Sequence, residues 1–571
     1  MRWISSVAVV LLCVSGVALG YFADQFVAVP QPKEIKTVGA LESARAVELD
    51  AKSLTIVNSA KVCDADCVAL VQGAFNRSVL AAMEAQRGLA PWKLSPHPEF
   101  SMAPVSKPSL AEKLTAVSVA FTGKMAAVPA LDGKSKAAEY YELAVDKTGA
   151  AKINAHTVWG VLHALETLCQ VVEWNGKDFV VQRVPFAVAD EPRFAWRGFM
   201  VDVARHYMPL RKLENLIDTL ASFKMNVLHM HLSDAQSFPL EIPELPAFAN
   251  AAFSRKAVYR TSDITNLTEY ARQRGVLLVP EIDIPAHTAS WRFANEDVTA
   301  NCFAYLAARP GSYEENLVAL NPASGETWKT IQTVLDRVGT TYAASPYTHV
   351  GGDEVSASCW QQCTQKDAIL AYMSEHGIAS YGDLEATFDR FTQKTVATGG
   401  KVPIVWEDVM MKDAALPGSI VHVWRNTERL VQAVRAGHYA IQSYGYYLDR
   451  QSPLCSGECT GINWMFSWTY RDIYRTDPTQ GLGLTADEEA RVLGGEAALW
   501  AESIDAPNFD AMGVSRLGAF AERLWSPATV TDPKALEIRT QRHRCLNVKR
   551  GIAPGAGPLS SDFCETARFF Q

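Results

Sequence analysis

The sequence predicts an α/β protein: a (β/α)8 barrel preceded by a smaller α+β domain. Eight short apolar stretches recur between residues 197 and 500, and helical stretches separate most of them. Eight such units over roughly 350 residues fit a barrel with some enlarged loops. The alternative is a doubly wound open sheet, but no GxGxxG follows a first strand, which disfavours a nucleotide-binding version of that fold.

The eight predicted strands share a feature that makes the barrel informative. They span residues 197–204, 226–232, 276–283, 347–351, 402–408, 420–424, 439–444 and 494–500. In a barrel the carboxyl ends of all strands meet at one rim, where active sites lie. The residues at those ends are mostly acidic or aromatic: Arg205, Asp234, Asp283, His287, Asp353, Glu354, Trp406, Glu407, Trp424, Tyr447, Asp449, Trp500 and Glu502. One acid after one strand is often a helix cap, but this convergence predicts an active site.

The remaining parts of the chain are predicted from composition and pattern. Residues 1–20 read as a signal peptide, with Arg2 before an apolar core and small residues at its end. That core is shorter than the roughly 20 residues of a membrane span, so an uncleaved anchor is the less favoured alternative. Residues 21–52 lack periodicity and form a lead-in. Residues 53–190 mix strand and helix patterns, and Pro192 marks the junction to the barrel domain, residues 191–571.

Bulk composition excludes some partners and permits others. The 571 residues carry a net charge of −8, and no dense Lys/Arg stripe is present, which argues against nucleic acid. No stretch beyond the N-terminus is long and apolar enough for a membrane span. The 14 tryptophans could stack on the apolar faces of sugars, although tryptophan is also a large core residue.

The cysteines and sequons are consistent with secretion. Of 11 cysteines, Cys13 lies in the signal peptide, and a secretory route permits disulfides among the rest. The pairs Cys63/Cys67, Cys359/Cys363 and Cys455/Cys459 look loop-like; each could also be half a zinc site, but none has a matching second half. Asn76 and Asn266 lie in N-glycosylation sequons.

One candidate chemistry for the rim is that of a metal hydrolase. His229 and His231 are two residues apart on a predicted strand and so point to the same side. Together with His287 and Asp353 they could ligate zinc or a pair of metals. The alternative is that these histidines lie inside the barrel and bond to polar neighbours.

The second candidate is glycoside hydrolysis, which needs a general acid and a group that stabilises the sugar cation. Neighbours on a strand point to opposite faces, so Asp353 and Glu354 share a pocket only if the backbone bends, which Gly351 and Gly352 permit. Even then they approach different parts of one substrate. A usual retaining pair instead faces across the anomeric carbon, so a nucleophile that belongs to the substrate would resolve the difficulty.

The motifs resemble one known family. "HVGGDEV" is similar to the H-x-G-G-D-E signature of family 20 β-N-acetylhexosaminidases, the group with the lysosomal hexosaminidases. Further blocks resemble the family in order: "RGFMVDVARHYMPL", "KMNVLHMHLSDAQSFP", "PEIDIPAHTASW", "VWED", "HVWRN" and "GGEAALWAE". "VWGVLHALETLCQ" resembles the family's non-catalytic N-terminal domain. The resemblance runs from about Ser53 to the end of the chain.

The resemblance implies retaining, substrate-assisted hydrolysis of terminal β-linked N-acetylglucosamine or N-acetylgalactosamine. The 2-acetamido oxygen would attack the anomeric carbon and form an oxazolinium ion. Glu354 would be the general acid and then base, Asp353 would hold the acetamido nitrogen, and Tyr447 would bond the acetamido oxygen. Trp406, Trp424 and Trp500 would wall the acetamido pocket. Arg205, Glu502 and Asp449 would bind hydroxyls, while Asp234 and His287 would tune Glu354. Repulsion between the two neighbouring acids should raise the pKa of one of them.

The resemblance also bears on cofactors, disulfides and specificity. The family has the "HxHL" strand without a catalytic metal, so no metal and no cofactor are expected. It implies disulfides Cys302–Cys359 and Cys545–Cys564, while Cys455–Cys459 would close a small extra loop. Cys63, Cys67, Cys169 and Cys363 stay unassigned.

In one respect the sequence departs from the family: Asp449 stands before Arg450. The family's neutral-substrate subunits carry Asp at the first of these positions, whereas the subunits that accept sulfated substrates carry Asn and then Arg, so this chain mixes the two patterns. The expected partner is an oligosaccharide or glycoconjugate, with a homodimer possible for the family. The expected location is the lysosome or the extracellular space. A catalytically inactive carbohydrate-binding protein on the same fold stays open as an alternative.

Overall fold

A computed structural model describes residues 28–37, 45–49, 55–58, 63–86, 113–123, 131, 136–174, 178–308, 314–449 and 468–552. Within them, eight parallel strands close into a barrel in the order of the sequence. The barrel strands are β11 (Trp196–Asp202), β12 (Val227–His231), β13 (Leu277–Glu281), β14 (Tyr347–His349), β15 (Val402–Trp406), β16 (Ile420–Val423), β17 (Tyr439–Gln442) and β18 (Val492–Leu499). The predicted (β/α)8 barrel is therefore confirmed, and each predicted strand overlaps one of these.

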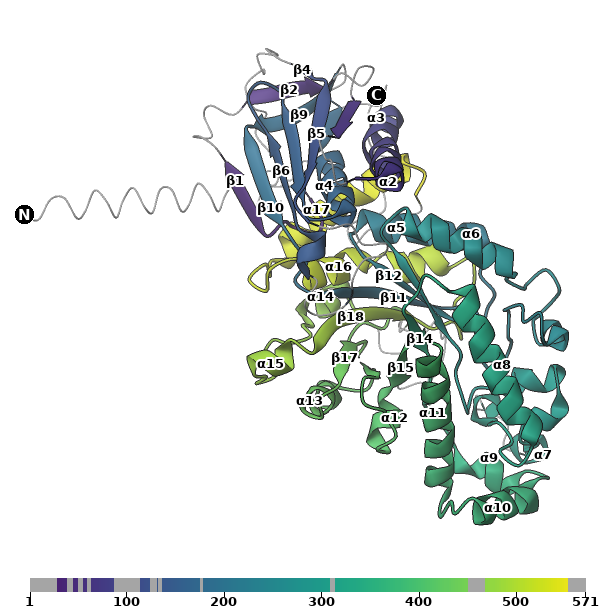
Figure 1. The fold of residues 1–571 in the computed structure, drawn as a ribbon. Coiled ribbons are helices and arrows are strands. Elements are labelled where there is room, and N and C mark those ends of the chain that lie inside the picture. The colour runs from purple at the N-terminus through teal and green to yellow at the C-terminus, as the bar shows by residue number, and fades with distance from the viewer. Residues whose placement is uncertain are drawn as a thin grey trace, which may run out of the picture.

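Helices follow most barrel strands, as a (β/α)8 fold requires. The longer ones are α5 (Leu210–Ser222), α6 (Thr261–Arg272), α8 (Gly325–Thr341), α11 (Tyr381–Thr398), α13 (Thr427–Arg435), α16 (Leu517–Trp525) and α17 (Pro533–Lys549). Further helices lie in the enlarged loops: α7 (Phe303–Ala307), α9 (Ala357–Gln362), α10 (Lys366–Glu375), α12 (Glu407–Met411), α14 (Tyr470–Arg475) and α15 (Ala486–Glu489); all of these except α10 are six residues or shorter. Figure 1 shows α8 to α11 extending away from the barrel on one side.

The smaller domain consists of two sheets and a helical layer. The larger sheet has the order β1-β10-β6-β7-β5-β3 and the smaller one the order β4-β2-β9-β8. The strands are β1 (Glu34–Thr37), β2 (Arg45–Leu49), β3 (Thr55–Asn58), β4 (Lys113–Leu114), β5 (Ala116–Phe121), β6 (Tyr141–Val145), β7 (Ala151–Ala155), β8 (Val172–Trp174), β9 (Phe179–Val184) and β10 (Phe186–Asp190). The helices are α2 (Ala65–Phe75), α3 (Ala81–Gln86) and α4 (Val158–Val171).

Two of these strands correct the predicted lead-in. β1 pairs antiparallel with β10, and β2 pairs with β9, so residues 34–37 and 45–49 of the predicted 21–52 lead-in contribute strands to the sheets. The two strands lack a strong alternating pattern because they are short and are completed by partners more than 100 residues away, which local periodicity does not reveal.

The smaller domain packs against the amino-terminal end of the barrel. All 14 residues of α4 are buried, and Arg197, near the start of β11, donates to Glu139 at 3.0 Å. Arg550, just after α17, donates to Glu166 of α4 at 2.9 Å. Figure 1 shows the yellow C-terminal helices α16 and α17 between the two parts. The carboxyl ends of the barrel strands, where the predicted site lies, face away from this contact.

The cysteines and sequons can be compared in part with their predictions. Cys302 and Cys359 form the predicted disulfide, and Cys63 pairs with Cys67, which had no assignment. Cys545 is disulfide-bonded, but Cys564, Cys455 and Cys459 lie outside the described residues, so those pairings stay predictions. Cys169 and Cys363 are buried thiols. Asn76 and Asn266 are exposed, and their glycosylation stays a prediction.

The predicted signal peptide, residues 1–20, lies outside the described residues. Across the part of the chain that the structure describes, no helix combines the length and apolar character that a bilayer crossing requires.

Candidate active site

A sharp turn after β14 presents the two neighbouring acids. Gly351 and Gly352 have φ angles of 65° and 98°, and Glu354 follows with a φ of 51°. A Cβ atom on Gly351 would overlap the Asp283 carboxylate, and one on Gly352 would overlap the Val409 side chain. Only glycine fits this turn, so the bend that the adjacency of Asp353 and Glu354 requires is present.

Two side chains from neighbouring elements hold this turn in place. The Gly352 N–H donates to Asp283 Oδ1 at 3.0 Å, and the Gly351 N–H donates to His349 Nδ1 at 3.1 Å. Asp283 follows β13 and His349 ends β14. Because both partners are buried in the barrel, the turn that aims the two acids is fixed by the core itself.

The two acids end up in opposite environments. Asp353 is buried, and its Oδ1 atom has no hydrogen-bond partner among the described residues. Burial raises the pKa of Asp353 well above its usual range, and the Asp283 and Glu354 carboxylates add to the effect. Glu354 is 49% exposed, and the His287 imidazole lowers its pKa. The expected raised pKa therefore falls on Asp353, while that of Glu354 shifts the other way.

His287 connects Glu354 to a chain of charged groups. Its Nε2 lies 3.5 Å from Glu354 Oε2, and its Nδ1 lies 3.2 Å from Asp234 Oδ1. Burial alone would lower the pKa of His287, but Asp234 raises it well above the usual range. The side chain is thus an imidazolium between two carboxylates, and the predicted Asp234–His287 contact is present.

Arg205 gathers the acids at the ends of β11, β12 and β18. Its guanidinium lies 3.0 Å from both Asp202 and Asp234 and 3.8 Å from Glu502. It also stacks over the Trp500 ring at 5.0 Å. Four sequence-predicted residues therefore meet at one place on the rim: Arg205, Asp234, Trp500 and Glu502.

Aromatic side chains cluster beside this charged group. Tyr447 packs in one cluster with Met200 and Ala498, and with Trp424 and Trp500 against it. Trp406 lies deeper, with its ring centroid 6.0 Å from that of Trp500. Asp449 is buried, and its charge acts on Arg516 nearby; Arg450 lies outside the described residues.

Sequence reasoning did not single out several residues that the structure brings to the site. Trp468, which precedes α14, packs against the same aromatic cluster; it belongs to residues 455–474, a stretch whose aromatic side chains could contact further sugar units or could form a packed loop. Asp408 accepts from Trp424 Nε1 at 3.0 Å and from Arg425 at 2.5 Å. Glu281 accepts from Trp406 Nε1 at 2.8 Å. Asp408 lies in the motif VWED beside Trp406, and Glu281 lies in the motif PEID beside Asp283. These two motifs are therefore the sequence signal that could have identified them.

The metal alternative does not fit the positions of the histidines. His229 and His231 do point to the same side, but each of their ring nitrogens lies within 3.1 Å of a carboxylate oxygen. Burial opposes protonation, yet Glu496 and Glu281 raise the pKa of His229 to about 9, and Glu281 raises that of His231 further. The set His229, His231, His287 and Asp353 does not converge. Potential ligand atoms do lie within 4.8 Å of one another in three other groups: Asp283, His287 and Asp353; His229, Glu281 and His349; and His229, His422 and Glu496.

Comparison with known proteins identifies the family. Residues 194–528 match the family model "Glycosyl hydrolase family 20, catalytic domain", and residues 28–171 match the model "beta-acetyl hexosaminidase like". This chain belongs to glycosyl hydrolase family 20. The predicted assignment to the β-hexosaminidases, as a glycoside hydrolase, is thereby confirmed.

Individual relatives agree along most of their length. The β-hexosaminidase subunit beta of Entamoeba histolytica is 37% identical over 508 residues, which cover 88% of this chain and 89% of the relative. The human β-hexosaminidase subunit beta is 34% identical over 433 residues, 75% of this chain and 73% of the relative. The solved structure of Flavobacterium johnsoniae chitobiase superposes with a TM-score of 0.71 at 26% identity, covering 92% of this chain and 73% of that one.

Proposed function

We propose that this family 20 exo-β-N-acetylhexosaminidase removes terminal β-linked N-acetylglucosamine or N-acetylgalactosamine with retention, and that the substrate supplies the nucleophile. The observation that carries the proposal is the contrast between the adjacent acids. An ordinary retaining pair faces one anomeric carbon from two sides. Here one acid is buried next to the Asp283 carboxylate and the other is half-exposed next to the His287 imidazole, which suits two different targets.

In the first step Glu354 gives its proton to the glycosidic oxygen as the bond between that oxygen and C1 breaks. The acetamido carbonyl oxygen forms a bond to C1 from the opposite face, and an oxazolinium ion results. In the second step Glu354 takes a proton from water, whose oxygen attacks C1 as the bond to the acetamido oxygen breaks. Two inversions at C1 give net retention.

Asp353 is suited to the amide side of this reaction. Its Oδ1, which has no hydrogen-bond partner among the described residues, can accept the acetamido N–H. Burial disfavours the carboxylate before reaction, so the positive charge that develops on the oxazolinium stabilises it more than the neutral amide does. The interaction therefore strengthens toward the transition state, which is the requirement for catalysis. Tyr447 would donate to the acetamido oxygen, with Trp406, Trp424 and Trp500 as walls; its packing against Trp424 and Trp500 supports this role.

The location and specificity are also proposals. The disulfides Cys63–Cys67 and Cys302–Cys359 support a secretory route, to the lysosome or outside the cell. The buried carboxylate of Asp449 supports a preference for neutral over sulfated substrates, because it would repel a sulfate near the outer hydroxyls. Equal kcat/KM for neutral and 6-sulfated N-acetylglucosaminides would contradict this preference. A homodimer is proposed from the family alone.

A matched pair of aryl glycosides tests the reaction. The aryl N-acetylglucosaminide should be hydrolysed with β-configured product, seen by proton NMR. The aryl glucoside with a plain 2-hydroxyl should react slower by several orders of magnitude, since an aligned internal nucleophile can supply an effective molarity of roughly 10⁵ M or more. Binding without turnover would favour the inactive carbohydrate-binding alternative. Fast turnover of the 2-hydroxyl substrate would overturn the substrate-assisted mechanism.

A further inference from the structure

A line of alternating carboxylates and imidazoles runs from the barrel interior to Glu354. Each of three histidines, His229, His231 and His287, lies between two acids. The successive closest distances are 2.6 Å for Glu496–His229, 3.1 Å for His229–Glu281, 2.6 Å for Glu281–His231, 3.0 Å for His231–Asp234, 3.2 Å for Asp234–His287 and 3.5 Å for His287–Glu354. Every member except Glu354 is almost fully buried.

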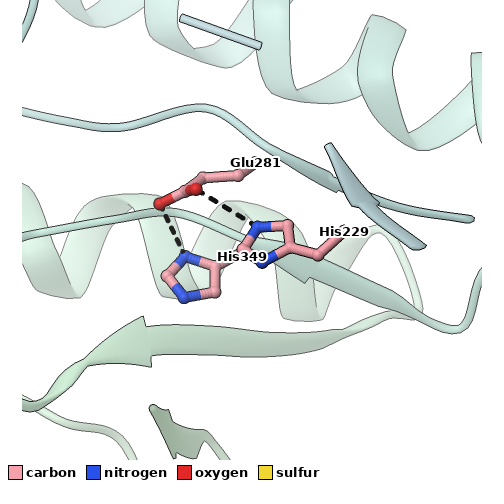
Figure 2. Close-up of side chains that lie close together, drawn as sticks. All are labelled: His229, Glu281 and His349. Carbon is pink, nitrogen blue, oxygen red and sulfur yellow. Dashed lines mark ion pairs between the residues drawn. The ribbon is translucent and has the colours of Figure 1, made fainter. Parts of the chain in front are cut away.

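Glu281 is the point at which this line branches. Its Oε2 accepts from His231 Nδ1 at 2.6 Å, toward Asp234 and the general acid. Its Oε1 accepts from Trp406 Nε1 at 2.8 Å, in the expected wall of the acetamido pocket. The same Oε1 lies 3.1 Å from Nδ1 of His349, which receives the Gly351 N–H of the catalytic turn. Figure 2 shows the Glu281 carboxylate in ion pairs with both His229 and His349.

We propose that Glu281 is a positioning residue that couples the two halves of the site: it fixes Trp406 on the side of the internal nucleophile and His231 on the side of the proton donor. The inference rests on the proposed function. A carboxylate suits this place because both of its oxygens accept, whereas an amide has one acceptor and one donor. Glutamine at this position can satisfy only one of the two N–H donors and leaves the other facing an N–H group.

The molecule supplies a matched control in Glu496. This second buried carboxylate also accepts from one tryptophan, Trp196 Nε1 at 2.8 Å, and from one histidine, His229 Nδ1 at 2.6 Å. Its side-chain hydrogen bonds within the described residues reach neither Trp406 nor His231. Glu281→Gln and Glu496→Gln therefore create the same buried mismatch, and only the first one breaks the proposed coupling.

Two readouts separate the two branches. The dependence of kcat/KM on the pKa of an aryl leaving group reports proton donation, because good leaving groups need less of it. The affinity for a thiazoline mimic of the oxazolinium reports the acetamido pocket. His231→Asn should steepen the leaving-group dependence and spare thiazoline affinity. Trp406→Phe replaces the indole by a smaller ring that has no N–H to donate to Glu281. It should weaken thiazoline binding and spare the leaving-group dependence.

We expect Glu281→Gln to lower kcat/KM by about 10- to 100-fold, the loss that a small misplacement of reacting groups causes, and to move at least one of the two readouts. Its effect should be non-additive with both His231→Asn and Trp406→Phe. Glu496→Gln should lower thermal stability similarly, yet leave both readouts in place.

Two results would overturn the proposal. In the first, Glu281→Gln lowers stability but leaves both the leaving-group dependence and the thiazoline affinity unchanged. In the second, Glu496→Gln changes these two readouts as much as Glu281→Gln does. If Glu281→Gln does not fold, Glu281→Asp, which keeps the charge but withdraws both oxygens, is compared with Glu496→Asp on the same criteria. Loss of the proposed function itself is a separate outcome, because it would appear in the unmodified enzyme as fast cleavage of the 2-hydroxyl substrate.

Discussion

Asp353 and Glu354 are neighbours in sequence, yet they belong to two different regions of the site. On the Asp353 side the surroundings are buried and rich in carboxylates, and the pKa of Asp353 is raised. On the Glu354 side the carboxylate is half-exposed beside the His287 imidazolium, and its pKa is lowered. A single turn that begins at two glycines presents both acids. The contrast teaches that like charges can be adjacent when backbone geometry directs them to different tasks.

The largest expected effect comes from the proton donor. Glu354→Gln should lower kcat/KM on a natural disaccharide by about 10²- to 10⁴-fold, the usual contribution of a general acid or base. The fall in kcat/KM should be much smaller for an aryl glycoside with a strongly acidic leaving group, because that group needs little protonation to leave. Steady-state kinetics on the two substrates measure this difference. Equal losses on both substrates would remove Glu354 from this role.

Asp353→Asn should affect both substrate types alike. The amide keeps the shape but carries no negative charge for the oxazolinium, so kcat/KM should fall by about 10²- to 10³-fold, as for loss of an electrostatic stabiliser in an active site. Thiazoline affinity should fall in parallel. A variant that loses activity only on poor leaving groups would show that the two acids share one task, and the contrast between them would be wrong.

The glycine turn that presents the two acids is testable by itself. Gly352→Ala should cost about 1–3 kcal/mol of backbone strain at a φ of 98°, and the new Cβ would also collide with Val409. Gly377→Ala is the control, because Gly377 has a φ of 66° but open space around its Cα. Activity should fall in the first variant and stay in the second. Equal thermal stabilities with full activity would show that the turn does not aim the acids.

The smallest effect is a shift in pH dependence. His287→Gln removes the main group that lowers the pKa of Glu354, so the pKa of Glu354 should rise. Glu354 must be protonated to donate, so the alkaline limb of kcat/KM should move to higher pH. The His287 cation also lowers the pKa of Asp353, which acts as the anion, so the acidic limb should move the same way. A pH profile with unmoved limbs and only a lower maximum would contradict this coupling.

Sequence patterns predicted the barrel and most of the rim, because strand ends in a closed parallel barrel must converge. The same patterns did not predict β1 and β2, whose pairing partners lie far away in sequence. They also did not indicate which of the adjacent acids would have the raised pKa. That outcome depends on the depth of each side chain and on Asp283 and His287, which come from other loops.

Glu281 is a second example of what the sequence could not predict. It sits inside a quoted motif, but its importance comes from three separate strands that bring His231, Trp406 and His349 to one carboxylate. The alternation of side chains along each predicted strand shows only that such residues point inward. Which of them meet follows from the tilt and closure of the barrel.

The central claim is that the two acids serve two targets because the nucleophile belongs to the substrate. The most direct measurement is kcat/KM for a series of aryl glycosides whose acetamido group carries zero, one, two or three fluorines. Each fluorine weakens the carbonyl oxygen as a nucleophile, and the free N-acyl sugars, bound as product inhibitors, control for fit to the pocket. The account predicts a steep, progressive fall in kcat/KM with product affinity nearly constant. A flat series, together with a fluorosugar that labels a protein carboxylate, would contradict it.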